Sequence, residues 1–173
     1  IFVPTMRAMN AEGRTFKGCL YFGLMITEKG PKVIEYNCRF GDPEAQVVLP
    51  LLDTDLLTIM QAVTEERLAE VDVRWKDGSA CCVIAASDGY PVSYEKGYEI
   101  DIPEDVLPHV YVAGAVEEEG RLLTSGGRVL GVTAVEPTLA EAIEASYDML
   151  DRIDFANKYY RADIGQRALK AVR

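Results

Sequence analysis

A short alternating segment near the start of the chain places the strongest constraint on its fold. The short run from Val33 to Tyr36 is apolar except for Glu35, and across a turn before it lie the apolar, aromatic-rich residues 17–27. Glu35, Asn37 and Arg39 follow one another at two-residue steps. Because alternate side chains of a β-strand point to the same face, a strand here lines up a carboxylate, a carboxamide and a guanidinium. We therefore expect an antiparallel pair of strands with one polar face.

This polar face suits the binding of a divalent cation and a phosphoryl group. Hard cations such as Mg²⁺ prefer oxygen ligands, which Glu35 and Asn37 supply. Arg39 adds a permanent positive charge for a transferring phosphoryl group or a carboxylate. The spacing alone equally allows an exposed strand without a catalytic role, in which Arg39 simply pairs with Glu35.

The six residues from Arg39 to Glu44 read RFGDPE and narrow the interpretation. Glu-x-Asn-x-Arg resembles the metal and phosphate strand of the ATP-grasp ligases. The RFGDPE continuation resembles the signature of the phosphoribosylamine–glycine ligase (glycinamide ribonucleotide synthetase) family of purine biosynthesis. Four more segments are similar to that family, and the similarity extends to Gly165: PTMR at 4–7, KGCLYFGLM at 17–25, DGYP at 88–91 and SGGRVL at 125–130.

The resemblance implies a reaction, its substrates and its cofactor. An enzyme of this family would phosphorylate the carboxylate of glycine with ATP, and the amine of 5-phosphoribosylamine would then attack the glycyl phosphate. It would use Mg²⁺ or Mn²⁺, with Glu35 and Asn37 as metal ligands that also hold the nucleotide. Many ATP-grasp enzymes have another acidic ligand on the preceding strand, where this chain reads Tyr21-Phe22-Gly23. More of the metal shell is then left to water and ATP phosphates.

The remaining alternatives are another ATP-grasp ligase, such as a carboxylase or transformylase, and a catalytically silent binding module of the same fold. The RFGDPE string argues against the first alternative. Nucleotide and metal titration would separate an enzyme from the second.

The chain is expected to be the C-terminal part of a longer enzyme. It begins at Ile1 rather than at a methionine, and no glycine-rich phosphate loop or G-x-G-x-x-G pattern is present. ATP-grasp ligases hold ATP between two α+β subdomains, and the resemblance covers only the second. We therefore expect the chain alone to be inactive and its partner to be the missing N-terminal part of the same enzyme.

Composition describes an ordinary globular protein. The formal net charge of −10 argues against a general nucleic-acid surface, which needs a basic patch. No stretch approaches the ~20 apolar residues of a membrane span, and no signal-like N-terminus is recognisable. The four cysteines lack metal-site spacing, so we expect reduced thiols and a cytoplasmic protein.

The predicted fold class is α+β. Residues 1–77 would form the second half of an ATP-grasp domain, an antiparallel sheet with helices, and residues 78–173 a small C-terminal α+β domain. The predicted helices lie at 44–49, ending before Pro50, at 56–67 after an Asp55 cap, and from Thr138 to about Ile153. Strands are predicted at 80–86, 110–117, 121–124 and 127–135, the middle two as a hairpin.

Asp42 and Glu44 flank a proline at the start of a predicted helix. Both could simply favour the positive end of the helix dipole. Asp42 follows the metal strand directly, and we expect it to contact the amine of the incoming substrate. Glu44 is interpreted as a residue of the helix start.

Gly126, Gly127 and Arg128 separate two apolar strands. Glycines let backbone N–H groups approach an anion, and a guanidinium binds phosphate with two parallel hydrogen bonds. Related ribonucleotide enzymes with the ATP-grasp fold place basic residues of this region on the ribose phosphate. The analogy predicts substrate binding here, and the alternative is a hairpin turn with a surface arginine.

Overall fold

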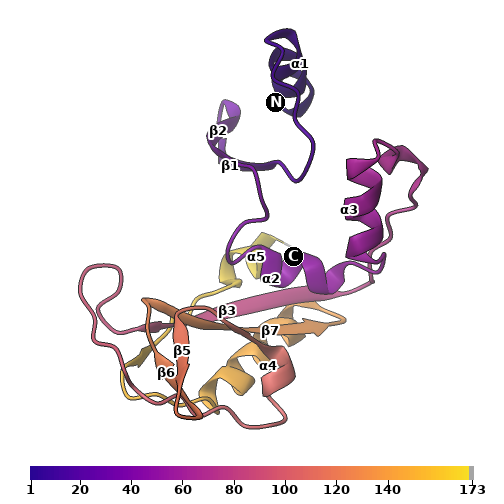
Figure 1. Cartoon of the computed structure of the whole chain (residues 1–173). Helices are drawn as coiled ribbons and strands as arrows, with labels where there is room; N and C mark the ends of the chain where they lie inside the picture. Colours follow the sequence, from indigo (N-terminus) through magenta and orange to yellow (C-terminus); the bar gives the residue numbers. More distant parts are fainter. Residues whose placement is uncertain (172–173) are drawn as a thin grey trace. The chain divides into compact units, whose positions relative to one another are not determined.

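The computed structural model describes residues 1–171, which divide into two compact units (Figure 1). The first unit comprises residues 1–45 and 52–75, and the second comprises residues 46–51 and the chain from Lys76 onward. The domain boundary predicted between residues 77 and 78 stays a prediction.

The centre of the first unit is the predicted antiparallel pair, β1 (Tyr21–Thr27) and β2 (Gly30–Asn37). Helix α1 (Phe2–Ala11) contacts one face of this pair through Phe2 and Thr5. Phe22 packs edge to face against Phe2 and Tyr36, with ring centroids 4.6 and 5.2 Å apart. Phe22 and Tyr36 are opposite each other in the register, so they mark the face that α1 contacts.

Helix α3 (Leu56–Thr64) completes the first unit, with the short 3₁₀ helix η1 (Leu68–Glu70) after it. The predicted cap is present, because Asp55 Oδ2 accepts a hydrogen bond from the Thr58 amide at 2.7 Å. The predicted extension to Arg67 is wrong. Glu66 adopts a left-handed backbone with φ of 59°, which an α-helix cannot continue.

The second unit is built on a four-stranded antiparallel sheet in the order β4-β7-β3-β8. Its long strands are β3 (Ser79–Ser87) and β7 (Arg128–Glu136), and its short ones are β4 (Val110–Val112) and β8 (Lys158–Tyr159). Figure 1 shows α4 (Leu139–Asp151) and α2 (Ala45–Leu51) on opposite faces of this sheet. The core includes Val83, Ala85, Val106, Val129, Leu130, Val132, Leu150 and Ile153.

Two polar devices fix α4 on the sheet. Thr138 and Glu141 form the predicted capping box, in which each side chain bonds the other residue's backbone amide. The buried Ser146 hydroxyl donates to the Cys81 carbonyl at 2.8 Å and accepts from the Ala134 amide at 3.1 Å. Ser146 therefore links α4 to both central strands without leaving a buried polar group unpaired.

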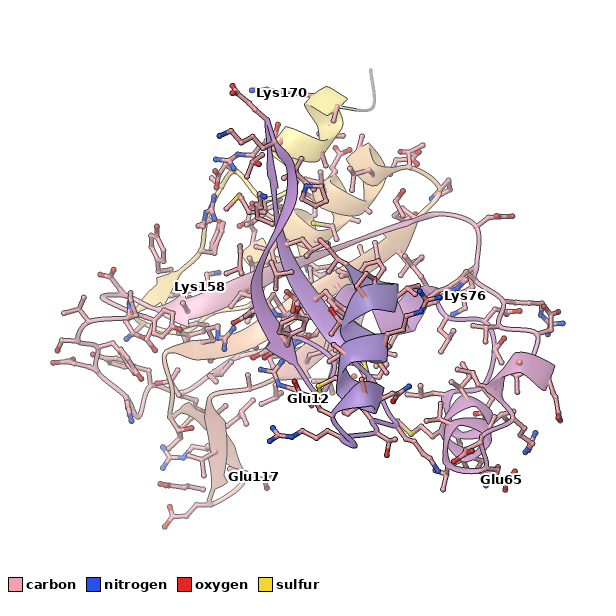
Figure 2. All side chains as sticks on the ribbon, turned by 90° about the horizontal axis from the view of Figure 1, so that it is seen from above. Glu12, Glu65, Lys76, Glu117, Lys158 and Lys170 are labelled. Atoms are coloured by element: carbon pink, nitrogen blue, oxygen red, sulfur yellow. The ribbon has the colours of Figure 1, made fainter. Side chains whose placement is uncertain are left out.

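The predicted strand over residues 110–117 is wrong, because the chain divides there between two sheets. β4 pairs with β7, whereas β5 (Ala115–Glu118) pairs with β6 (Arg121–Thr124) as the predicted hairpin. Gly114 makes the transition: its amide donates to the Arg128 carbonyl at 2.9 Å. A Cβ on Gly114 would lie 2.5 Å from that carbonyl oxygen, so the close approach requires glycine. Figure 2 labels Glu117 on the β5–β6 hairpin.

Several elements are absent from the predictions. Helix α1 buries no residue and has no side-chain cap, so it lacks the sequence pattern of a core helix. α2 continues through Pro50, contrary to the prediction, since a proline in the last turn removes only one helical hydrogen bond. Also missed are the 3₁₀ helices η1 and η2 (Leu107–His109), β8 and α5 (Gln166–Ala171).

Candidate metal and substrate sites

Glu35 and Asn37 lie side by side on β2. The Asn37 Nδ2 amide donates to Glu35 Oε1 at 3.0 Å. In the register Asn37 is opposite Tyr21 and Glu35 is opposite Gly23, so these four positions share the face opposite to the one that α1 contacts. The amide oxygen of Asn37 and the second oxygen of Glu35 are the donors that a hard cation prefers. The donor set fits Mg²⁺ or Mn²⁺.

Gly23 makes room for the Glu35 side chain. A Cβ built on Gly23 would lie 2.8 Å from Glu35 Cγ, a contact that real side chains avoid. The register also shifts between Gly23 and Leu24, which is the mark of a β-bulge. Bulges often re-aim a side chain next to a functional site. The glycine and the bulge together allow Glu35 to cross the neighbouring strand.

Arg39 and Asp42 lie in the loop after β2. Both residues are exposed, and Arg39 Nη1 donates to the carbonyl of Phe40 at 2.8 Å. Glu44, two residues after Asp42, is linked back to the strand pair. Tyr21 Oη donates to Glu44 Oε1 at 3.1 Å.

The Tyr21 hydroxyl is held in its protonated form by its surroundings. The hydrogen bond to Glu44, partial burial, and the negative charges of Glu44 and Glu35 all raise the pKa of Tyr21 above its ordinary value. A protonated phenol can donate to a carboxylate, which a phenolate cannot. Tyr21 therefore acts as a donor on this face at neutral pH.

Gly126 and Gly127 lie between β6 and β7, which belong to different sheets. β6 pairs with β5, and β7 pairs with β3 and β4, so this segment connects two sheets rather than closing a hairpin. Gly126 N–H donates to the Gly114 carbonyl at 2.9 Å, and Ser87 Oγ donates to the Gly126 carbonyl at 3.0 Å. Arg128 is exposed at the start of β7.

A tyrosine ring packs on the second glycine of this segment. A Cβ on Gly127 would lie 2.0 Å from Tyr90 Cδ2, so only glycine fits beneath the ring. The Ser87 amide donates to the Gly127 carbonyl at 2.8 Å. The predicted binding segment is therefore fixed to the loop after β3, which carries the family-like DGYP motif at 88–91.

The structure groups the predicted site residues by unit. Glu35, Asn37, Arg39 and Asp42 belong to the first unit, and Gly126–Arg128 belong to the second. Over residues 1–171, no group of three or more His, Cys, Asp or Glu side chains is placed to hold a metal ion. A cation on β2 would therefore take its ligands from one carboxylate, one amide and non-protein oxygens.

Sequence reasoning missed two parts of this arrangement. In the sequence, Tyr21 marks only the position where other ATP-grasp enzymes have a carboxylate. The predicted antiparallel pairing of the two strands could nevertheless have placed Tyr21 opposite Asn37. Tyr90 has no signal of its own beyond the DGYP motif, because its contact with Gly127 joins segments far apart in the sequence.

Comparison with sequence models of known families shows to which family the chain belongs. The sequence model described as "Phosphoribosylglycinamide synthetase, C domain" matches residues 80–167, about half of the chain. The model described as "Phosphoribosylglycinamide synthetase, ATP-grasp (A) domain" matches residues 1–45. The chain belongs to the phosphoribosylamine–glycine ligase family.

Individual members of this family are similar to the chain over nearly its whole length. The phosphoribosylamine–glycine ligase of Caldanaerobacter subterraneus subsp. tengcongensis is 48% identical over 165 residues, which are 95% of this chain and 40% of that protein. A bifunctional purine biosynthetic protein of Pichia angusta is 47% identical, covering 98% of this chain and 22% of that protein. The chain thus spans well under half the length of these family members.

The fold of the family is confirmed by a solved structure. The crystal structure of phosphoribosylamine–glycine ligase from Thermotoga maritima superposes with a TM-score of 0.81 at 35% identity, covering 91% of this chain and 39% of that one. The predicted α+β class, with the end of an ATP-grasp domain before a small C-terminal domain, is therefore confirmed. Among residues 1–171, no helix is long and apolar enough to cross a membrane.

Proposed function

We propose that the chain is the C-terminal part of an enzyme that ligates glycine to 5-phosphoribosylamine. ATP would be converted to ADP and phosphate, and the product would be glycinamide ribonucleotide. The observation that carries the proposal is the Glu35–Asn37 pair, hydrogen-bonded at 3.0 Å on an open strand face. It lies in a chain that is 48% identical over 165 residues to a ligase of this name.

Glu35 and Asn37 would hold the divalent cation, Mg²⁺ or Mn²⁺, and through it the nucleotide phosphates. Such a cation neutralises the charge that develops during phosphoryl transfer. Arg39 lies in the loop directly after β2 and would orient the phosphoryl group as it passes to the glycine carboxylate. Its guanidinium is permanently charged, so it needs no proton transfer to act. Asp42 would receive the substrate amine.

Gly126, Gly127 and Arg128 would bind the 5-phosphate of phosphoribosylamine. A phosphate monoester carries nearly two negative charges and favours a planar donor beside backbone N–H groups. Tyr90 covers one side of Gly127, so position 127 must be glycine whatever the segment binds, and the proposed phosphate contact rests on the exposed Arg128. Replacing Arg128 with Lys would keep the charge but lose the bidentate geometry.

The complete site would need the preceding part of the enzyme. We infer that this chain alone has no ligase activity, because a half-site cannot position ATP against glycine. Its partner is then the N-terminal part of the same protein. The cysteines at 19, 38, 81 and 82 form no disulfide bond in the described part of the chain, which suits a reducing compartment such as the cytoplasm.

The proposal is tested in a complete ligase that contains this chain. Glu35→Gln should reduce glycine-dependent ADP release by at least a hundredfold, with the circular dichroism spectrum unchanged. The matched control is Glu28→Gln, which removes a carboxylate from the turn of the same hairpin. Nucleotide binding without glycine- and phosphoribosylamine-dependent turnover by the unmodified enzyme would instead identify a silent binding module.

A further inference from the structure

A second carboxylate is tied to the strand face that carries the predicted metal ligands. Tyr21 is opposite Asn37 in the β1–β2 register, and its hydroxyl donates to Glu44 Oε1 at 3.1 Å. Glu44 is the residue immediately before α2 and lies outside the strand pair. The tyrosine therefore brings a carboxylate from the following loop to the face of Glu35 and Asn37.

The Glu44 carboxylate is hydrogen-bonded on one side and lies close to bare backbone on the other. Tyr21 bonds one of its oxygens, and the backbone of the buried Gly41 lies against the other. A Cβ built on Gly41 would be 1.9 Å from Glu44 Oε2, so any side chain at position 41 would displace the carboxylate. Glu44 is half-buried, whereas Asp42 is exposed. A residue that merely favours a helix start requires neither the bound phenol nor the bare backbone.

The register places Glu44 and Glu35 at the same face of the strand pair. Tyr21, which binds Glu44, is opposite Asn37, and Gly23, on the same face of β1, is opposite Glu35. Two carboxylates facing one site repel each other, and a divalent cation between them relieves the repulsion. Over residues 1–171, no three His, Cys, Asp or Glu side chains are placed to hold a metal ion. Because the Glu44 carboxylate already accepts a hydrogen bond from Tyr21, we expect it to reach a cation through a bound water molecule.

We propose that Glu44, held by Tyr21, is a positioning residue of the metal site and accepts a hydrogen bond from a water molecule on the cation bound by Glu35 and Asn37. This inference rests on the metal site of the proposed function. Mg²⁺ and Mn²⁺ keep several waters when few protein ligands are present. An acceptor that orients such a water raises the affinity for the metal without touching it.

The test measures Mn²⁺ binding to the 173-residue chain from the electron paramagnetic resonance signal of free Mn²⁺. Glu44→Gln and Tyr21→Phe should each weaken binding about tenfold, the lower end of second-shell effects. The double variant should bind no more weakly than Glu44→Gln, because both changes act through one carboxylate. Additive losses would mean independent roles and would overturn the proposal.

Matched controls keep the outcomes separate. Glu28→Gln removes a carboxylate from the same hairpin, and Tyr36→Phe removes a hydroxyl from its other face; both should bind within twofold of the unmodified chain. If Glu44→Gln and Tyr21→Phe bind as these controls do while Glu35→Gln loses binding, the metal site stands and the role of Glu44 is refuted. If Glu35→Gln binds as tightly as the unmodified chain, the proposed metal site fails, and this inference with it. If neither binds, the measurement is repeated in a complete ligase with ADP, which supplies the phosphate oxygens, and absence of binding there also refutes the metal site.

Discussion

The two units differ in where they keep their apolar residues. In the first unit, α1, β1 and β2 contain no buried residue, and Ile26 is 77% exposed. In the second unit, β7 alone has six consecutive buried positions, and α4 adds four more. The second unit therefore carries a core of its own, while the first presents the proposed metal ligands on a thinly covered sheet. Substitutions in the two units should differ in their effect on stability.

The largest effect is expected from the core of the second unit. Leu130→Ala should lower the free energy of unfolding by about 2–5 kcal/mol, because it removes buried methyl groups and leaves a cavity. Ile26→Ala in the first unit should change it by less than about 0.5 kcal/mol. Urea titration followed by far-ultraviolet circular dichroism gives both values. Equal effects at the two positions would contradict the comparison.

Trp75, the single tryptophan of the chain, sharpens this comparison because it belongs to the first unit. Leu130→Ala should shift the circular dichroism transition and leave the Trp75 fluorescence transition near its original urea concentration. Coincident shifts of both signals would show that the two units unfold as one cooperative body.

A smaller loss is expected from Ser146→Ala, which leaves the Cys81 carbonyl and the Ala134 amide without their buried partner. Each unsatisfied buried group costs about 1–3 kcal/mol, so the two groups together should cost the second unit about 2 kcal/mol or more in thermal or urea unfolding. The exposed Ser93→Ala serves as the control. A loss no larger than that of the control would mean that water replaces the hydroxyl.

Removal of the α4 cap comes next. Thr138→Ala should cost about 1 kcal/mol, since it breaks the hydrogen bond to the Glu141 amide at the helix start. Thr138→Ser keeps the hydroxyl and should recover most of that stability. The measurement is the urea midpoint of the second unit; if Ser and Ala behave alike, the methyl group rather than the cap is responsible.

The smallest effect is a pH dependence of α3 in the first unit. Hydrogen bonds from the Thr58 amide and hydroxyl lower the pKa of Asp55 below its ordinary value. A lowered folded-state pKa gives stability that is present above the unfolded pKa, near 4, and is lost as the pH falls through the folded pKa. The urea midpoint of the Trp75 fluorescence transition should therefore fall as the pH drops below about 4. Asp55→Asn should remove this slope, and an unchanged slope would assign it to other carboxylates.

Patterns of short range were sufficient for much of the fold. The β1–β2 pair, the Asp55 cap, the Thr138–Glu141 capping box and the β5–β6 hairpin were all predictable, because each depends on residues within a few positions of one another. The errors occur where distant segments intervene. Residues 110–117 were predicted as one strand, yet Gly114 turns the chain between sheets because the Arg128 carbonyl and Gly126 pack against it. The metal and substrate roles of the predicted site residues stay predictions.

The sequence by itself determined the family, through RFGDPE and its companion motifs, and placed Glu35 beside Asn37, because a two-residue period fixes the face of a strand. The sequence could not determine which residues of other segments contact that face. Gly23 opposite Glu35, Tyr21 on Glu44 and Tyr90 on Gly127 are contacts between strands and loops whose register is set only when the whole sheet packs. The sequence gives the chemical type of each side chain. The groups that surround a carboxylate, and so set its pKa, are brought to it only by the tertiary structure.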